Sequence, residues 1–178
     1  MSAESQNRCR TPVFVKGEGA PEVWRFVHRY APDVVEEGQP APDFELESDA
    51  GETVKLSDLR GKPVVLYFYP KDDTPGCTRQ ACGIRDAWEE FQKAGAVVFG
   101  ISADTAASHE KFKSKYSLPF TLLADPEHKL GEPYGVGQEG KSSYERSTFV
   151  IDADGSVAKI LRRVNPDRHA DEVLAALS

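Results

Sequence analysis

The sequence predicts an α/β domain in which a central mixed β-sheet is flanked by helices. Apolar runs of strand length alternate with segments whose apolar residues recur at helical spacing, a pattern typical of a sheet covered by helices. The run from Val64 to Tyr69 is apolar and β-prone throughout, as expected of a central strand buried on both faces. Near the C-terminus, Asp152-Ala153-Asp154-Gly155 separates two further apolar runs. This turn predicts an antiparallel hairpin, which makes the sheet mixed.

Residues 1–35 are predicted to form an N-terminal extension ahead of a domain over residues 36–178. Within the extension, Val13-Phe14-Val15 predicts a short strand. Apolar residues recur at helical spacing over 21–30 and predict a short amphipathic helix. The turn-rich segment 38–42 marks the boundary with the domain.

The expected elements of the domain follow from local apolar patterns and from the residues that begin and end them. Proline is favoured at the first helical position and glycine just after the last, so Pro75 and Gly95 bound a long helix over 75–93. Asn165 is the expected cap of a closing helix over 166–177. The other elements are strands at 54–56, 64–69, 96–102, 120–123, 147–151 and 157–163, a helix at 105–116, and helical turns after Ser57 and over 126–131.

Length and composition narrow the classes of protein. The 178 residues suit one domain with an extension. The net charge of −7 argues against nucleic acid or an anionic membrane surface as the main partner. No apolar run approaches the roughly 18–20 residues that a membrane-spanning helix needs. The first ten residues are polar, and glutamates at 4, 18 and 22 depart from transit-peptide composition, so we expect a cytoplasmic protein.

The three cysteines are too few for a disulfide framework. Their number alone is compatible with two interpretations: the cysteines are small buried hydrophobic residues, or two of them form a redox-active pair in a reducing compartment. The position of Cys77 favours the redox-active pair. Thr74 and Pro75 are expected at the cap and first position of a helix, and Cys77 then falls in its first turn. Partial positive charge and free N–H groups there favour a thiolate, and Gly76 leaves room for a small molecule.

Cys82 follows Cys77 by five residues on the same predicted helix. In an unbroken helix that offset places the two Cα atoms roughly 8–9 Å apart, whereas a disulfide needs about 4.4–6.8 Å. Bond formation between them would therefore require the first turns to unwind. Gly76 and Gly83 lower that cost, each by about 1 kcal/mol relative to alanine. We expect a redox-dependent change of order across residues 74–86.

A metal site is the alternative hypothesis for paired cysteines, but the spacing of the two cysteines disfavours it. A C-x4-C pair differs from the usual C-x2-C arrangement. The four histidines are scattered and are expected to be surface or packing residues: His28, His109, His128 and His169. We expect no metal. Charged residues near the site are expected to face solvent, namely Asp72 and Asp73 beside the thiol and the lysines Lys111, Lys113 and Lys115.

The motifs around the thiol resemble those of the peroxiredoxin family. The pattern Pro70-x-x-x-Thr74-x-x-Cys77 is similar to the peroxiredoxin signature. The longer string 69–78, with Cys82 beyond it, resembles the peroxiredoxin Q / bacterioferritin comigratory protein branch. Further similar pieces are Pro40-Ala41-Pro42-Asp43-Phe44 and Arg146-Ser147-Thr148-Phe149-Val150-Ile151-Asp152. The resemblance covers roughly residues 36–178.

This resemblance implies a thioredoxin-like fold and a thiol peroxidase that acts on hydrogen peroxide and organic hydroperoxides. Cys77 would attack the peroxide and become a sulfenic acid, and Cys82 would resolve it as an intramolecular disulfide. An external dithiol, thioredoxin first of all, would reduce that disulfide, and no bound cofactor is needed. Charge moves onto the leaving oxygen in such a reaction, so fixed donors stabilise the transition state. Thr74, the Cys77 N–H and the guanidinium of Arg146 would supply them, and Pro70 would shield the pocket.

The sequence departs from other branches of the same family. No cysteine follows Cys82, and no Gly-Gly-Leu-Gly segment is present. A resolving cysteine near the C-terminus of a second subunit is therefore excluded, and a monomer is expected. Cys9 has no counterpart in the family pattern and is expected to be a bystander.

Other functions on related architecture stay open at this point. A thiol–disulfide oxidoreductase normally uses C-x-x-C, unlike this chain. A copper chaperone would need C-x3-C and a suitably placed histidine. A redox sensor would differ from the enzyme only in what reads the disulfide.

Overall fold

A computed structural model describes residues 34–138 and 140–178 of the chain. The strands are β1 (Glu45–Ser48), β2 (Thr53–Lys55), β3 (Val64–Phe68), β4 (Val97–Ser102), β5 (Thr121–Ala124), β6 (Ser147–Ile151) and β7 (Val157–Arg162). The helices are the 3-10 turn η1 (Leu56–Leu59), α1 (Pro75–Asp86), α2 (Trp88–Lys93), α3 (Ala106–Tyr116) and α4 (His169–Ala176). The predicted strand at 13–15 and helix at 21–30 lie outside the described residues. No helix in the described part of the chain is long and apolar enough to cross a bilayer.

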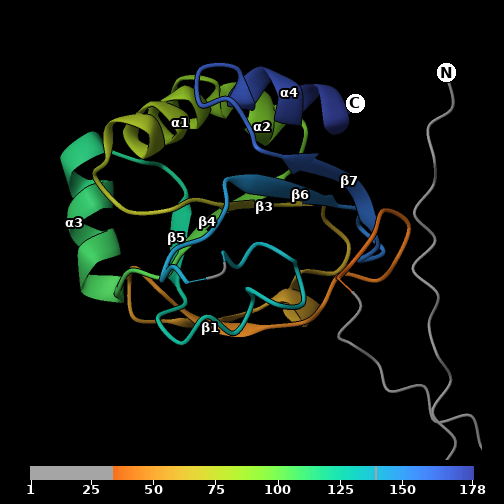
Figure 1. Ribbon diagram of the computed structural model, residues 1–178. Helices are drawn as coiled ribbons and strands as arrows, with labels where there is room; N and C mark the ends of the chain where they lie inside the picture. Colours follow the sequence, from red (N-terminus) through yellow and green to blue (C-terminus); the bar gives the residue numbers. More distant parts are fainter. Residues whose placement is uncertain (1–33, 139) are drawn as a thin grey trace, which may run out of the picture. The chain divides into compact units, whose positions relative to one another are not determined.

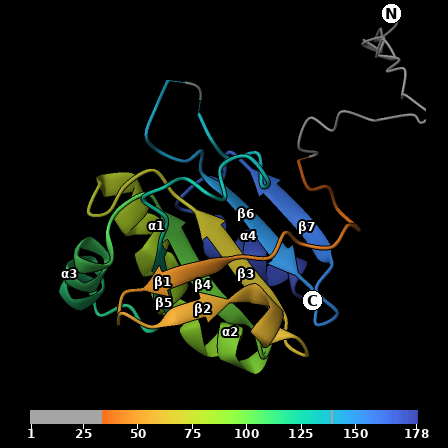
Figure 2. The same cartoon turned by 90° about the horizontal axis from the view of Figure 1, so that it is seen from below.

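The seven strands form one mixed sheet, as the sequence predicts. Their order is β2-β1-β5-β4-β3-β6-β7, and Figure 2 shows the sheet from below. The central strands β3, β4 and β5 are parallel, while β6 and β7 on one side and β1 and β2 on the other pair antiparallel. Every residue of β3 is buried, so the apolar run of the sequence is the central strand.

Side chains of β3 alternate between two hydrophobic layers, because successive residues of a strand point to opposite faces. Tyr67 belongs to the layer beneath α1, α2 and α4, the helices that lie above β3 and β6 in Figure 1. Phe68 belongs to the opposite layer, where its ring lies 5.3 Å from that of Tyr134 and 5.4 Å from that of Tyr144. The segment between β5 and β6 supplies both tyrosines. One face of the sheet is therefore covered by helices and the other largely by irregular chain.

Three elements differ from the sequence prediction. The expected helix over 75–93 is two helices, because Ala87 leaves helical geometry at ψ 15°. The closing helix begins at His169 rather than 166, since the side chain of Asn165 accepts from the Asp167 N–H in a turn before it. Strand β1 was not expected, because it buries only Leu46 and Ser48.

We predict that Gly100→Ala destabilises the protein. Gly100 on β4 lies opposite Tyr67 on β3, and a Cβ there would sit 2.5 Å from the Tyr67 hydroxyl. Overpacking of this kind costs about 1–3 kcal/mol of unfolding free energy, measurable by urea denaturation. Gly83→Ala is the matched control, because a Cβ at Gly83 meets nothing within 4 Å. Equal stability of the two variants would contradict this account of the core.

Candidate active site

The predicted thiol lies where the chain leaves β3 and begins α1. Residues 69–74 connect the two, and Pro75 is the first residue of α1. Cys77 is 2% exposed. The Thr78 N–H bonds the Thr74 carbonyl at 2.8 Å, whereas the Cys77 N–H has no acceptor among the described residues. Free N–H groups of a first helical turn attract negative charge. The buried sulfur therefore lies at the positive end of α1.

The structure brings Arg146 to this sulfur from 69 residues away. Its Nη2 donates to Cys77 Sγ at 3.5 Å, and its Nη1 donates to Gln80 Oε1 at 2.5 Å. Arg146 immediately precedes β6, which pairs with β3 so that Ser147 lies opposite Phe68. Gly76 leaves room for the guanidinium, because a Cβ there would lie 3.0 Å from Nη2. The predicted pairing of thiol and guanidinium is thus present.

Thr74 and Pro70 border the same helix start. Thr74 has the extended backbone of a cap residue, but its side chain makes no capping hydrogen bond. Its hydroxyl instead donates to the Lys71 carbonyl at 3.1 Å, which leaves the oxygen free to accept. Pro70 follows the buried Tyr69 and is itself half-buried.

Cys82 lies on α1 with Cys77, and no break separates them. Both thiols are free, Cys77 buried and Cys82 partly exposed. The helical offset predicted from sequence therefore applies, and the two Cα atoms are roughly 8–9 Å apart, too far for a disulfide.

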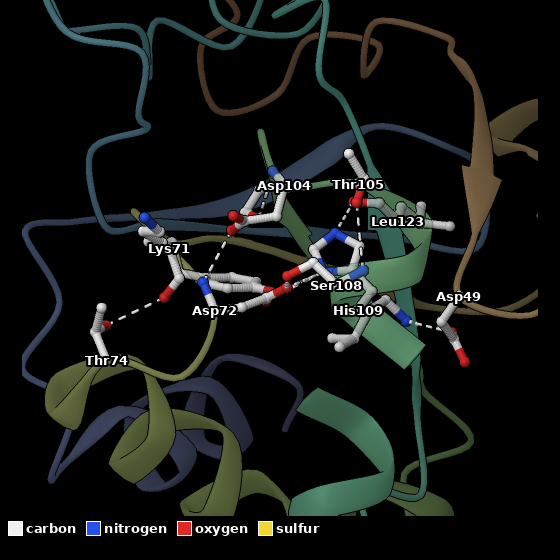
Figure 3. A network of polar contacts seen from close by, with 12 residues as sticks. Asp49, Lys71, Asp72, Thr74, Asp104, Thr105, Ser108, His109 and Leu123 are labelled. Carbon is white, nitrogen blue, oxygen red and sulfur yellow. Dashed lines mark hydrogen bonds and ion pairs between the residues drawn. The ribbon is translucent and has the colours of Figure 1, made fainter. Parts of the chain in front are cut away.

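The expectation that Asp72 faces solvent is wrong. Asp72 is 8% exposed, and its side chain points from the 69–74 segment toward α3, as Figure 3 shows. Its carboxylate accepts from the Tyr69 hydroxyl at 2.6 Å and from the Ser108 hydroxyl at 2.7 Å. His109 Nδ1 lies 2.8 Å from it. The Asp72 N–H donates to Asp104 at 2.9 Å, so both backbone and side chain hold this residue in place.

His109 is the main side-chain partner of the buried Asp72 carboxylate. Its Nδ1 faces Asp72, and its Nε2 faces the Leu123 carbonyl at 3.1 Å (Figure 3). Both partners are acceptors, so the ring lies where a hydrogen on either nitrogen finds an oxygen to bond. Burial raises the pKa of Asp72, but the hydrogen bond and charge of His109 outweigh this, and the net pKa is lowered. The pair fixes the 69–74 segment to α3.

Asp73 is exposed, as expected, but it is also paired. It adopts a φ of +54°, and its carboxylate binds Lys115 at 2.7 Å and the Tyr116 hydroxyl at 2.6 Å. Lys115 is therefore not merely part of a solvated helix face. The two aspartates beside the thiol each meet a partner side chain of α3, which reduces their opposition to negative charge on the sulfur.

A second polar network lies behind Arg146 and was missed by the sequence prediction. Gln80, Thr148 and His169 are all fully buried. Gln80 Nε2 lies 3.3 Å from His169 Nδ1, and His169 Nε2 lies 2.7 Å from Thr148 Oγ1. Burial, followed by the charge of Arg146, lowers the pKa of His169 to about 3, so its ring is neutral. One signal was available, because Gln80 lies three residues after Cys77 and so shares its helix face.

Comparison with known proteins identifies the class to which this fold and site belong. The family model described as AhpC/TSA family matches residues 37–160, and the chain belongs to that family. The putative peroxiredoxin bcp of Coxiella burnetii is 50% identical over 149 residues, which cover 80% of this chain and 99% of the relative. Peroxiredoxin Bcp of Bacillus subtilis is 51% identical over 149 residues, which cover 80% and 95%.

Solved structures agree with these relatives. The bacterioferritin comigratory protein of Xanthomonas campestris has a TM-score of 0.74 at 36% identity, covering 80% of this chain and 97% of that one. Peroxidoxin BcpB of Mycobacterium tuberculosis has a TM-score of 0.75 at 38% identity, covering 80% and 96%. The predicted thioredoxin-like fold and the Bcp / peroxiredoxin Q branch are confirmed, and the chain is a thiol-dependent peroxidase.

We predict that Asp72→Asn lowers stability in a pH-dependent way. The variant should lose about 2–3 kcal/mol of unfolding free energy at pH 7, because a charged buried hydrogen-bond network is broken. The folded-state pKa of Asp72 is lowered, so its contribution is present above the unfolded pKa of about 3.9 and is lost as pH falls below it. Urea unfolding between pH 7 and pH 3 measures the difference from wild type.

Asp73→Asn is the matched control, because the same substitution there affects only exposed contacts, with Lys115 and the Tyr116 hydroxyl, and should cost less. A difference between wild type and Asp72→Asn that stays constant down to pH 3 would contradict the buried carboxylate.

Proposed function

We propose that Cys77 is the nucleophile that reduces the peroxide. The contact between Arg146 and Cys77 Sγ at the start of α1 carries this proposal. The thiolate attacks the terminal oxygen of hydrogen peroxide or an alkyl hydroperoxide, and the O–O bond breaks. The sulfur gains the hydroxyl as a sulfenic acid, while the leaving oxygen takes a proton and departs as water or alcohol.

The neighbouring groups are arranged to stabilise this transfer of charge. Arg146 donates toward the sulfur, and the free Cys77 N–H points from the same helix end. Such fixed donors favour the transition state as charge moves from sulfur to oxygen. The Thr74 proton is already given to the Lys71 carbonyl, so in our proposal the Thr74 oxygen accepts from the hydroperoxide O–H and orients it. Pro70, which has no N–H, shields the approach.

Cys82 resolves the sulfenic acid in the next step of the proposal. Its thiol attacks Cys77, water leaves, and an intramolecular disulfide forms. Because both cysteines lie on the continuous helix α1, its first turns must unwind. The contacts of Asp72 and Asp73 with α3 keep the segment before the helix fixed, so the unwinding begins beyond it. A dithiol such as thioredoxin then reduces the disulfide by exchange.

One copy of the chain suffices for this cycle. Cys77, Cys82 and Arg146 all belong to the same chain and to the described part of residues 36–178. We therefore propose a monomeric enzyme whose catalytic domain is residues 36–178, with residues 1–35 as an extension to it.

Substitution of each cysteine tests the assignment of roles. In peroxide consumption coupled to thioredoxin and its reductase, Cys77→Ser should fall to background. Cys82→Ser should lose turnover but still undergo one oxidation at Cys77, detectable by mass spectrometry, because only the resolving thiol is gone. Cys9→Ser is the matched control and should keep the wild-type rate. Wild-type turnover in Cys77→Ser would refute the proposal.

We predict that Gly83→Ala slows formation of the disulfide. Alanine at this open helical position stabilises α1 by up to about 1 kcal/mol, which corresponds to about fivefold in rate if the helix must unwind first. Rapid-quench mass spectrometry should show the Cys77–Cys82 bond forming more slowly, with the preceding oxidation of Cys77 unchanged. Hydrogen exchange over residues 74–86 should be faster in the oxidised protein. Equal protection in both redox states would contradict the unwinding step.

A further inference from the structure

The Arg146 guanidinium is held by Gln80 as well as by the sulfur. Only the oxygen of the Gln80 amide can accept from Arg146 Nη1, so Oε1 faces the guanidinium. The Nε2 of the same amide must then point away. Gln80 is fully buried, so the amide cannot turn toward water without loss of its partners. The direction of one buried amide thus helps to set where the guanidinium lies.

His169 determines which way that amide faces. Gln80 Nε2 can only donate, so His169 Nδ1, 3.3 Å away, must accept. The ring proton is then on Nε2, which donates to Thr148 Oγ1 at 2.7 Å. Burial and the Arg146 charge lower the pKa of His169 to about 3, so the accepting form is present throughout the neutral range. A protonated or rotated ring would leave the Gln80 amide without an acceptor.

The same network joins three elements that meet behind the sulfur. Gln80 lies on α1, Thr148 lies on β6 two residues after Arg146, and His169 lies on α4. The Tyr67 ring packs edge-on against the His169 ring at 5.6 Å, which limits its rotation. His169 lies outside the residues 37–160 matched by the family model, so the family match does not point to it.

We propose that His169 is a positioning residue for the peroxidase reaction: its neutral ring accepts from Gln80 and thereby holds the amide oxygen that fixes Arg146 against Cys77. The inference rests on the proposed function, in which Arg146 stabilises charge at the reacting sulfur. Among the described residues no carboxylate pairs with Arg146, and its acceptors are the Gln80 oxygen and the sulfur. The uncharged side chains of Gln80 and His169 thus orient the guanidinium without neutralising its positive charge.

Two substitutions of His169 in the full-length chain separate its contacts. Asparagine carries its amide on Cγ, where histidine carries Nδ1, so His169→Asn can still accept from Gln80. Glutamine carries its amide one bond farther, at the level of Nε2, so His169→Gln can reach Thr148 but leaves Gln80 without an acceptor. We expect His169→Gln to slow oxidation of Cys77 by hydrogen peroxide by about 10- to 100-fold in stopped-flow measurements. His169→Asn should restore most of that loss.

A second readout distinguishes positioning from mere structural support. The pH at which alkylation of Cys77 by iodoacetamide is half-maximal should rise in His169→Gln toward the value of Arg146→Gln. Combining His169→Gln with Arg146→Gln should slow the reaction no further than Arg146→Gln alone, because the two act through one guanidinium. Gln80→Met, which breaks the same link with a side chain of similar shape, should reproduce the loss and serves if His169→Gln does not fold.

The outcomes separate the inference from the function on which it rests. A wild-type rate in Arg146→Gln overturns the proposed function. Loss in Arg146→Gln with wild-type rates in His169→Gln and Gln80→Met overturns only the inference. Equal loss in both His169 variants, or a full additional loss in the double variant, also overturns it.

Discussion

The site depends on the approach of one guanidinium to one sulfur at the start of a helix. Antiparallel pairing of β6 with β3 places Ser147 opposite Phe68, so Arg146 lies beside the chain that leaves β3 toward Cys77. The absent side chain of Gly76 leaves the space that Arg146 occupies. The sheet register, the helix start and one glycine must therefore agree before a donor can reach the thiol at 3.5 Å.

Two requirements oppose each other along α1. Peroxide reduction needs a fixed thiol, because catalysis by positioned donors is lost with small displacements. In the proposed cycle, disulfide formation with Cys82 needs the same turns to unwind. In our proposal these demands are separated in space, because the segment before α1 is tied to α3 through Asp72 and Asp73, whereas α1 contains Gly83, where an added Cβ would meet no atom within 4 Å. In this proposal the contacts that hold the site lie before the helix, and the turns that unwind lie beyond them.

The parts of this arrangement that could be predicted from the sequence are those with local chemical signals. Thr74 and Pro75 predict the helix start that contains Cys77, and the apolar run at 64–69 predicts a central strand. Both predictions succeed because each signal lies within a few consecutive residues. The burial of Asp72 could not be foreseen, since its partner His109 lies 37 residues away on a helix face with no local mark. The link between Gln80 and His169 spans 89 residues and was hidden for the same reason. The break at Ala87 could not be predicted because neither glycine nor proline marks it in the sequence.

The two buried histidines near the site have partners of opposite kinds. His109 faces two acceptors, a carboxylate and a carbonyl, and its contact with Asp72 lowers the pKa of that carboxyl despite burial. His169 faces an amide donor and lies near Arg146, so a second positive charge there would repel the guanidinium and lose the Gln80 contact. The ring that faces two acceptors therefore lies beside a buried anion, and the neutral ring lies beside a cation that keeps its charge. Arg146 remains the cation that contacts the sulfur, and in the proposed reaction it favours the thiolate and stabilises the charge that moves to the peroxide oxygen.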